Sequence, residues 1–371
     1  MLLLTPGPAQ IPEEVLKALG QPVIHHRTPE FESLFAEVQM GLKKVFQTEN
    51  QIVLVTGTGT TAMEAAFVNL FTREDRVLVI NAGKFGERWT KIAQAYQVDH
   101  DEFFIGIGSP QVGEPLYLDQ LELFIKSQPR KPTALLFQAS ETSTGVQLPT
   151  KEITALAHKY EMLAVCDGIT ACGIFDLPMD AWKMDVVLSA SQKAFMLPPG
   201  LAFVAFNAKA WEKAEQTQKN PQRLPKFSLD LLRERALQAK NQTAWTPATQ
   251  LIQALQISLK IMLKDGLSKL FEKNEQMAEA TRAGIQALGL ELFAPHAASP
   301  AVTSVKVPTQ VDCSKLIRTL KEDHQIVITG GQDALKGKIF RLSHFGSVTE
   351  FDRVRALKAI ASALEKQGYR K

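Results

Sequence analysis

Short apolar runs alternate with amphipathic stretches between residues 50 and 206. Six of these runs are almost continuous: residues 52–57, 76–81, 134–139, 163–168, 186–191 and 201–206. Continuous rather than alternating hydrophobicity is typical of strands that are buried on both faces. The stretches between them, such as 60–71 and 150–160, place apolar residues at helical spacing. Repeated strand–helix–strand units predict a mostly parallel sheet in an α/β domain, and such sheets bind ligands at the carboxyl ends of their strands.

A different pattern begins near Thr246. Apolar residues then recur at steps of three and four up to about Leu288, which predicts two successive helices interrupted at Asp265 and Gly266. Three strand candidates and a closing helix follow, at residues 301–307, 325–331, 338–346 and 350–367. We therefore predict three parts: an N-terminal arm over residues 1–20, a large domain over 21–250 and a small α+β domain over 251–371.

The composition narrows the possible functions. The chain has 371 residues, of which 45% are hydrophobic and 22% charged, and its formal net charge is +3. Lys and Arg are scattered, which does not indicate a nucleic-acid surface, and no apolar stretch reaches the ~18 residues that span a bilayer. The segment MLLLTPGPAQIP lacks the basic start of a signal peptide. Three cysteines, an odd number, indicate a reducing compartment. We expect a cytoplasmic protein without nucleic-acid or membrane partners.

Two ionisable side chains follow predicted strands of the large domain. Lys193 lies among small polar residues after the run 186–191, and Asp167 ends the run 163–168. The two are about one strand–helix–strand step apart, so one sheet edge can present both. A lysine amine can form a Schiff base with an aldehyde, and an aspartate can keep a pyridine nitrogen protonated. This pair of groups is typical of enzymes that use pyridoxal phosphate.

A phosphate group needs its own binding site. The turn TGTGTTAMEAA, residues 56–66, follows the first predicted strand and supplies two glycines, several hydroxyl groups and the start of a helix. Small residues let the backbone approach an anion, and the helix start favours negative charge. Two further features follow strands: the polar loop SETSTGVQLP, residues 140–149, and Phe85, whose ring can stack on a flat cofactor.

Each of these residues has a simpler interpretation when it is taken alone. A lysine at a strand end is usually exposed, an Asp before Gly is often a turn residue, and a threonine before a helix is often its cap. Adjacent His25 and His26 would point to opposite faces of a strand, and Cys166 and Cys172 have the wrong spacing for a zinc pair. We therefore predict no metal site and rely on the combination of residues rather than on any one.

Five segments together resemble the class V aminotransferases of fold type I, and among them the alanine/serine–glyoxylate aminotransferase group. These segments are TPGP (5–8), GTGTTAMEAA (57–66), ETSTGV (141–146), CDG (166–168) and SASQKAFMLPPG (189–200). The resemblance extends from residue 5 to residue 346. It implies a mostly parallel seven-stranded sheet with helices on both faces, and a smaller C-terminal α+β domain.

The resemblance also implies roles for individual residues. Lys193 would bind the cofactor covalently and move the proton, and Asp167 would pair with the pyridine nitrogen. Phe85 and Ile169 would cover the two faces of the ring. The remaining implied contacts are Thr58, Gly59, Thr60 and Gln192 for the phosphate, Thr142 for the ring hydroxyl region and Arg341 for the substrate carboxylate. A guanidinium fork suits a carboxylate because it can donate two parallel hydrogen bonds.

Active sites of this family are shared between the two subunits of a homodimer. The segment HHRTPEF, residues 25–31, matches the part that reaches across, so the resemblance implicates His26 and Arg27 in substrate binding. The segment NQTAWTP, residues 241–247, matches the part that contacts the partner's phosphate, with Gln242, Thr243 and Thr246 as alternatives. A homodimer is therefore expected.

The implied activity is transamination with pyridoxal phosphate, from a small amino acid (alanine or serine) to a 2-oxo acid, with glyoxylate favoured. Alternatives on the same scaffold are a cysteine desulfurase, a lyase, an aminoethylphosphonate transaminase and a non-catalytic scaffold subunit. A desulfurase needs a nucleophilic cysteine shortly before the substrate arginine, and residues 320–341 contain none. The joint presence of Lys193, Asp167 and Arg341 favours an enzyme over a scaffold.

Overall fold

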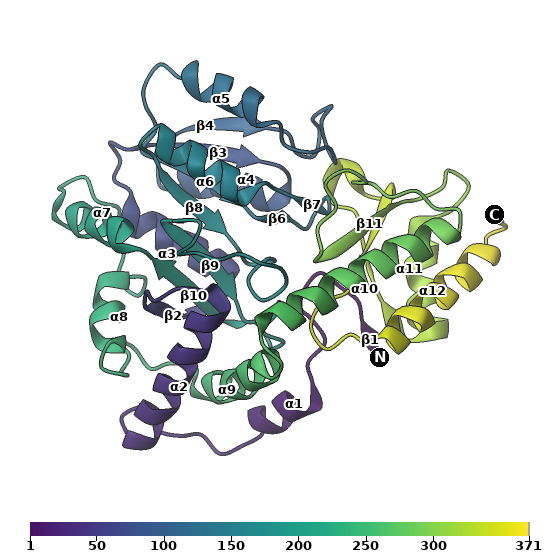
Figure 1. Ribbon diagram of the computed structural model, residues 1–371, viewed down its shortest axis with the longest axis horizontal. Coiled ribbons are helices and arrows are strands. Elements are labelled where there is room, and N and C mark those ends of the chain that lie inside the picture. The colour runs from purple at the N-terminus through teal and green to yellow at the C-terminus, as the bar shows by residue number, and fades with distance from the viewer. Residues whose placement is uncertain (370–371) are drawn as a thin grey trace.

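A seven-stranded sheet forms the centre of the larger unit in the computed structural model, which describes residues 1–369 (Figure 1). The strand order is β2 (Ile52–Gly57), β10 (Gly200–Phe206), β9 (Val186–Ala190), β8 (Leu163–Asp167), β5 (Ala134–Gln138), β3 (Arg76–Asn81) and β4 (Asp99–Phe104). Strand β10 runs antiparallel to both of its neighbours, and the other neighbouring pairs are parallel. The predicted six runs and the mainly parallel sheet are confirmed.

Helices cover both faces of this sheet (Figure 1). Alternate residues of a strand enter different hydrophobic clusters: Ile52 and Leu54 belong to one, Val53 and Val55 to the other. One face is covered by α2 (Pro29–Phe46), α5 (Leu118–Lys126), α6 (Thr150–Lys159) and α9 (Thr249–Leu263), and the other by α3 (Gly59–Leu70), α4 (Lys84–Ala95), α7 (Ala208–Lys219) and α8 (Leu231–Gln238). The strands are continuously apolar because neither face meets water.

The hydrophobic pattern did not predict strand β4. Its sequence, DHDEFF, is mostly polar and its side chains are half-buried or exposed, because β4 is the edge strand of the sheet. The guanidinium of Arg76 on β3 lies 2.7 Å from the carboxylate of Asp99 and 2.5 Å from that of Asp101. Ion pairs and the backbone ladder therefore help to hold this strand in place, together with Phe103, which packs against the hydrophobic cluster of one sheet face.

A smaller C-terminal unit is built on a second, antiparallel sheet. Its strands are ordered β11 (Val302–Lys306), β14 (Ile339–Ser343) and β13 (Thr329–Gly330). Helices α10 (Leu267–Ala287), α11 (Cys313–His324) and α12 (Glu350–Glu365) pack around it on a separate hydrophobic cluster. The predicted strand over 325–331 is split into β12 (Ile326–Val327) and β13. The expected smaller α+β unit is confirmed.

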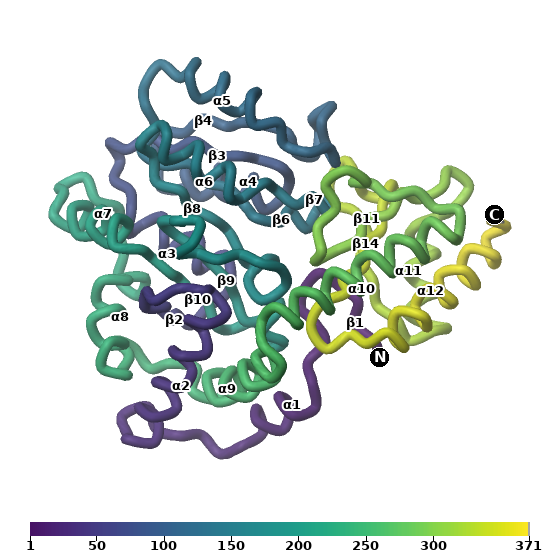
Figure 2. Tube along the Cα trace, viewed as in Figure 1, coloured from purple at the N-terminus to yellow at the C-terminus, as the bar shows by residue number. Residues whose placement is uncertain are grey.

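The first residues of the chain lie against this C-terminal unit (Figure 2). Strand β1 (Leu2–Leu3) pairs in parallel with β12, and the Ser343 hydroxyl donates a 2.7 Å hydrogen bond to the Thr5 carbonyl. Helix α1 (Glu13–Leu19) then packs on α9 of the larger unit. The domain limits predicted from the sequence, 1–20, 21–250 and 251–371, remain a proposal. Residues 370 and 371 lie outside the described part of the chain.

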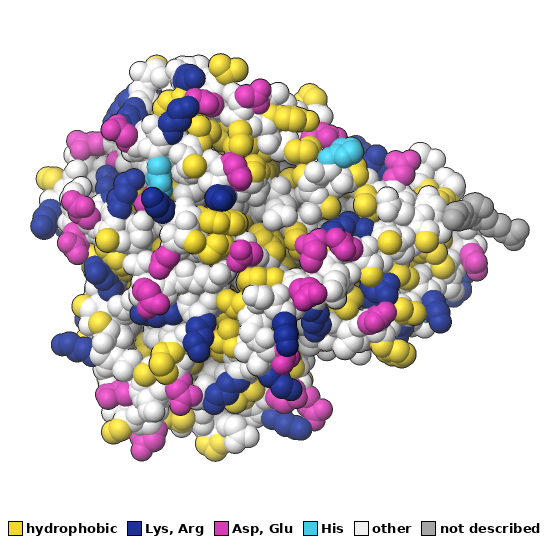
Figure 3. All heavy atoms as spheres, in the orientation of Figure 1, with side chains coloured by type: hydrophobic (Ala, Val, Ile, Leu, Met, Phe, Trp, Pro, Cys, Tyr) yellow, Lys and Arg dark blue, Asp and Glu magenta, His cyan; other side chains and the backbone are white. Residues whose placement is uncertain are grey.

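The face seen in Figure 3 intersperses basic and acidic side chains. Within residues 1–369, no helix is both long and apolar enough to cross a bilayer. The same residues contain no group of three or more His, Cys, Asp or Glu arranged to hold a metal ion. The three cysteines are buried and free.

Candidate active site

A cavity of about 310 Å³ lies where the carboxyl ends of the parallel strands meet. The ends of β2, β3, β8 and β9 and the segments that follow them, including the start of α4, contribute side chains to its wall. Eight residues that the sequence singled out line this cavity: Thr58, Gly59, Thr60, Phe85, Asp167, Ile169, Gln192 and Lys193. The fold thus brings together residues that are up to 135 positions apart in the sequence.

Lys193 is buried in the wall of this cavity, with 8% of its surface exposed. Its Nζ donates a 2.5 Å hydrogen bond to the Pro6 carbonyl and lies 5.9 Å from the centroid of the Phe85 ring. Burial lowers the pKa of Lys193 to about 8, the Asp167 carboxylate opposes this shift, and the Arg341 cation adds to it. An amine with a lowered pKa is more often neutral near pH 7, which is the form that attacks an aldehyde.

The lowered pKa gives a testable pH dependence. We expect cofactor-free protein to capture pyridoxal phosphate faster as the pH rises, with an inflection near pH 8 and a plateau above about pH 9, because only the neutral amine reacts. A lysine with the ordinary pKa of about 10.4 would still accelerate between pH 9 and 10. Stopped-flow absorbance of cofactor capture between pH 6 and 10 measures the profile. An inflection near 10 would contradict the burial argument.

Asp167 ends strand β8 and is 4% exposed. One carboxylate oxygen accepts a 2.8 Å hydrogen bond from the Ile169 N–H. Burial raises the pKa of Asp167 to about 6, although the Ile169 hydrogen bond and the Arg88 cation lower it. A buried carboxylate is stabilised by any proton donor or cation that reaches it, and a protonated ring nitrogen is such a partner.

The start of helix α3 forms one wall of the cavity. Thr58 precedes the helix, and its N–H donates a 3.1 Å hydrogen bond to the Thr61 hydroxyl. A β-carbon on Gly59 would lie 2.5 Å from Cδ1 of Ile169, so a larger residue would close this wall. The first N–H groups of a helix lack partners within the helix and favour an anion. This wall therefore suits a phosphate.

Two buried polar atoms near the cavity have no hydrogen-bond partner within residues 1–369. They are the Thr142 hydroxyl and the Oε1 atom of Gln192. Buried polar groups are nearly always satisfied in native proteins, so these atoms indicate a polar group that completes the site. Pyridoxal phosphate fits this set because it offers an aldehyde for Lys193, a ring nitrogen for Asp167, a ring hydroxyl and a phosphate.

Arg341 on strand β14 is buried without an acidic partner. Its guanidinium donates to the Gly330 carbonyl at 2.8 and 3.1 Å and to the Thr142 carbonyl at 2.7 Å. No carboxylate of residues 1–369 lies within ion-pair distance of it. Burial lowers the pKa of Arg341, and the Glu141 charge opposes this, yet arginine stays charged in proteins. An unneutralised buried guanidinium suits a carboxylate ligand.

Seven predicted residues lie outside the set that lines the cavity in the described chain: Thr142 and Arg341, described above, and His26, Arg27, Gln242, Thr243 and Thr246. Thr246 is exposed, Thr243 donates its hydroxyl proton to the Trp245 carbonyl at 2.7 Å, and His26 is half-buried. Arg27 donates a 2.7 Å hydrogen bond to Oε1 of Gln242. The two segments predicted to reach across a dimer therefore contact each other on one chain, and their role in a partner's site stays a prediction.

Arg88 lines the cavity and was not identified from the sequence. Its guanidinium carbon lies 4.9 Å from the centroid of the Phe85 ring, an arrangement that allows a cation–π contact. The two residues are three positions apart on α4 and so share one helix face. This three-residue spacing from Phe85 was the sequence signal that could have identified Arg88. The positive charge of Arg88 acts on both Asp167 and Lys193.

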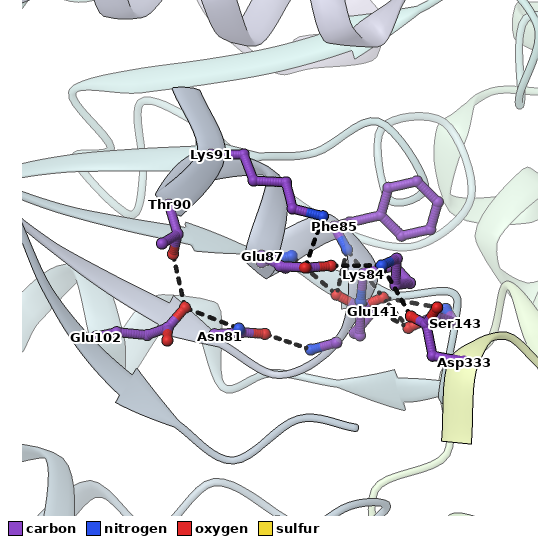
Figure 4. A network of polar contacts seen from close by, with 12 residues as sticks. Asn81, Lys84, Phe85, Glu87, Thr90, Lys91, Glu102, Glu141, Ser143 and Asp333 are labelled. Atoms are coloured by element: carbon purple, nitrogen blue, oxygen red, sulfur yellow. Dashed lines mark hydrogen bonds and ion pairs between the residues drawn. The ribbon is translucent and has the colours of Figure 1, made fainter. Parts of the chain in front are cut away.

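Glu141 was also missed, although the segment that contains it was noted. Its fully buried carboxylate accepts hydrogen bonds of 3.1 Å from the N–H groups of Phe85, Gly86 and Ser143, and one of 2.5 Å from the Ser143 hydroxyl (Figure 4). Burial raises the pKa of Glu141, and these donors oppose the shift. Through these hydrogen bonds the carboxylate connects the start of α4, which carries Phe85, to the loop that carries Thr142.

Comparison with known proteins identifies the family. The family model for class V aminotransferases matches residues 1–356. A Synechococcus protein named soluble hydrogenase, small subunit, is 38% identical over 99% of this chain and 94% of its own. An L-aspartate–glyoxylate aminotransferase of Paracoccus denitrificans is 33% identical over 97% of this chain and 89% of its own. The crystal structure of an alanine–glyoxylate aminotransferase from Nostoc sp. superimposes with a TM-score of 0.90 at 29% identity, over 98% and 95% of the two chains. The chain therefore belongs to the class V aminotransferases, and it is a pyridoxal-phosphate-dependent transaminase that acts on an amino acid and a 2-oxo acid.

Proposed function

We propose that this transaminase moves the amino group of a small amino acid, alanine or serine, to glyoxylate. The observation that carries the proposal is the buried guanidinium of Arg341, which has no acidic partner among the described residues and contacts the Thr142 loop beside the cofactor cavity. Every amino acid and 2-oxo acid presents a carboxylate to such a group. A cavity of about 310 Å³ that also holds the cofactor favours small substrates, and two of the similar proteins are named for glyoxylate.

Different residues of the site have different roles in the reaction. Bound pyridoxal phosphate supplies an electron sink for the charge that develops at the substrate α-carbon. Arg341 orients the substrate by its carboxylate, and the α3 start with Thr58 and Gly59 holds the phosphate. Lys193 takes the proton from the α-carbon and returns it, a general acid–base role worth about 10²–10⁴-fold in rate. Asp167 would stabilise the positive charge of a protonated pyridine nitrogen.

Phe85 and Ile169 have a different task. Both line the cavity, and Ile169 lies against Gly59 at the phosphate end. Their apolar side chains exclude water from the cofactor and strengthen each electrostatic contact in the site. Gln192 and Thr142 supply the two unpartnered polar atoms described above, which we assign to the phosphate and to the ring hydroxyl.

We also propose that the active enzyme is a cytoplasmic homodimer. The contact between Arg27 and Gln242 supports this, because it gathers both predicted cross-subunit segments into one surface patch. His26, Thr243 and Thr246 would belong to the same contribution to the partner's site. The free, buried cysteines suit a reducing compartment. Sedimentation velocity of the purified protein tests the dimer, and a monomer with full activity would contradict it.

Spectral titration of the cofactor-loaded enzyme tests the donor. Alanine and serine should each bleach the visible absorption of the lysine-bound cofactor, and added glyoxylate should restore it. Aspartate belongs in the same series because a similar protein is named for it. Bleaching by aspartate alone would overturn the choice of alanine and serine while leaving transamination in place.

A desulfurase gives a different result. Cysteine would then release sulfide, and a thiol near Arg341 would be required. Cys313 lies at the start of α11, is buried and donates to the Ile339 carbonyl, and it is not part of the cavity wall in the described chain. We therefore expect no sulfide release with cysteine as substrate.

A further inference from the structure

Lys84 occupies an unfavourable position for a cation. It is the first residue of α4, where the helix dipole favours negative charge. Two carboxylates offset this: Glu87, one turn along the helix, lies 2.6 Å from the Lys84 ammonium, and Asp333 of the C-terminal unit lies 2.8 Å away. The Asp333 hydrogen bond is the larger cause of the raised pKa of Lys84, with Glu87 second. Helix α4 is thereby connected to the C-terminal unit directly before Phe85 (Figure 4).

Asp333 belongs to a tightly folded loop. It begins the short 3₁₀ helix η1 (Asp333–Leu335) with a φ of +47°, in the left-handed region that non-glycine residues seldom adopt. The preceding Gly331 leaves no room for a β-carbon, which would collide with the Leu335 carbonyl. Such a backbone persists only where its surroundings hold it. The ion pair to Lys84 is one such restraint.

The same loop holds the guanidinium of Arg341. The Gly330 carbonyl, three residues before Asp333, accepts two of its hydrogen bonds, and the Thr142 carbonyl of the larger unit accepts a third. The N–H of Lys84 donates a 3.0 Å hydrogen bond to the Ser143 hydroxyl, next to Thr142. Together with the chain segments 142–143 and 330–333, these contacts form a closed ring. It passes from Arg341 through Thr142, Ser143, Lys84, Asp333 and Gly330 back to Arg341.

We propose that the ion pair between Lys84 and Asp333 is a latch between the two units that positions the Arg341 guanidinium for the substrate carboxylate. The inference rests on the proposed role of Arg341. The latch touches neither the phosphate wall nor Lys193, so we expect its larger effect on amino-acid binding. Both residues are positioning residues, since each acts through Arg341.

The substitutions Lys84→Gln and Asp333→Asn each remove one charge of the pair with little change in shape. Spectral titration of the loaded enzyme should give a dissociation constant for alanine or serine about 5-fold higher in each variant, the upper range for a partly exposed ion pair. The double variant should be no weaker than either single one, because both remove the same interaction. Lys84→Arg keeps the charge and should retain wild-type affinity. Lys91→Gln is the matched control, because Lys91 pairs with Glu87 on the same helix and contacts neither Asp333 nor the loop in the described chain.

A second readout needs no substrate. Lys336 is exposed in the latched loop, so trypsin cleavage after it reports how firmly the loop is held. We expect faster cleavage in Lys84→Gln and Asp333→Asn and an unchanged rate in Lys91→Gln. Equal cleavage and equal amino-acid affinity in all variants would overturn the latch. If no amino acid bleaches even the wild-type enzyme, the proposed donors fail, whereas the cleavage rates still decide the latch.

Discussion

Lys193→Ala is expected to abolish transamination and to leave the protein without covalently bound cofactor. The side chain supplies both the amine that bonds to the aldehyde and the base that moves the α-proton. We expect the amino-acid half-reaction to slow by about 10⁴-fold, the upper range for a lost general acid–base group. Borohydride reduction followed by peptide mapping should place the pyridoxyl group on Lys193 in the wild-type enzyme and on no peptide of the variant.

Unfolding of the Lys193→Ala variant would also abolish activity, so its stability must be measured separately from its reactivity. Removing the ammonium leaves the buried Pro6 carbonyl without its donor, a change of about 1–3 kcal/mol in the free energy of unfolding. Thermal unfolding should therefore stay close to that of the wild type. A pyridoxyl adduct on another lysine of the wild-type enzyme, or a variant that keeps its visible absorption, would contradict the assignment.

Arg341→Ala is expected to weaken every amino-acid donor by about 2–5 kcal/mol, at least about 30-fold in dissociation constant. The substrate carboxylate would lose a buried, oriented cation that no other residue of the described chain neutralises. Spectral titration with alanine and with serine measures the loss. Cofactor affinity should change little, because Arg341 does not line the cavity of about 310 Å³.

A substrate without a carboxylate is the matched control for this variant. Ethylamine and ethanolamine correspond to alanine and serine with the carboxylate removed, so wild type and Arg341→Ala should react with them equally slowly. If donor affinity stayed unchanged in the variant, another cation would bind the carboxylate, and Arg88 would be the first candidate because it lines the cavity.

The sequence predicted the central strands because nearly all of their side chains are apolar. Strands buried on both faces must be apolar at every position, so β2, β5 and β9 stand out in any hydropathy pattern. The edge strand β4 has no such requirement, and the contacts that hold it include ion pairs with Arg76 that are visible only once the strands are neighbours. Pairing of β1 with β12 involves two residues on each side, too few for a periodic signal.

The sequence predicted those site residues whose role follows from their position at the end of a strand. Lys193 and Asp167 follow predicted strands, and the structure places both in one cavity. Glu141 and Arg88 were missed because burial of one carboxylate and the orientation of one guanidinium depend on the packing of α4 against the loop after β5. The contact between Arg27 and Gln242 joins residues 215 positions apart, beyond any local pattern.

The pairing of residues 2–5 with late parts of the chain has a consequence for biosynthesis. Leu2 and Leu4 donate to carbonyls of residues 325 and 327, and the Leu4 carbonyl accepts from the N–H of Ser343. At about 5–20 residues per second, the ribosome needs roughly 20 to 70 s to reach that strand. Until then the segment that brings the Pro6 carbonyl to the catalytic amine has no strand to join. The nascent polypeptide therefore cannot acquire its vitamin-derived prosthetic group in the finished pocket during translation of the large domain.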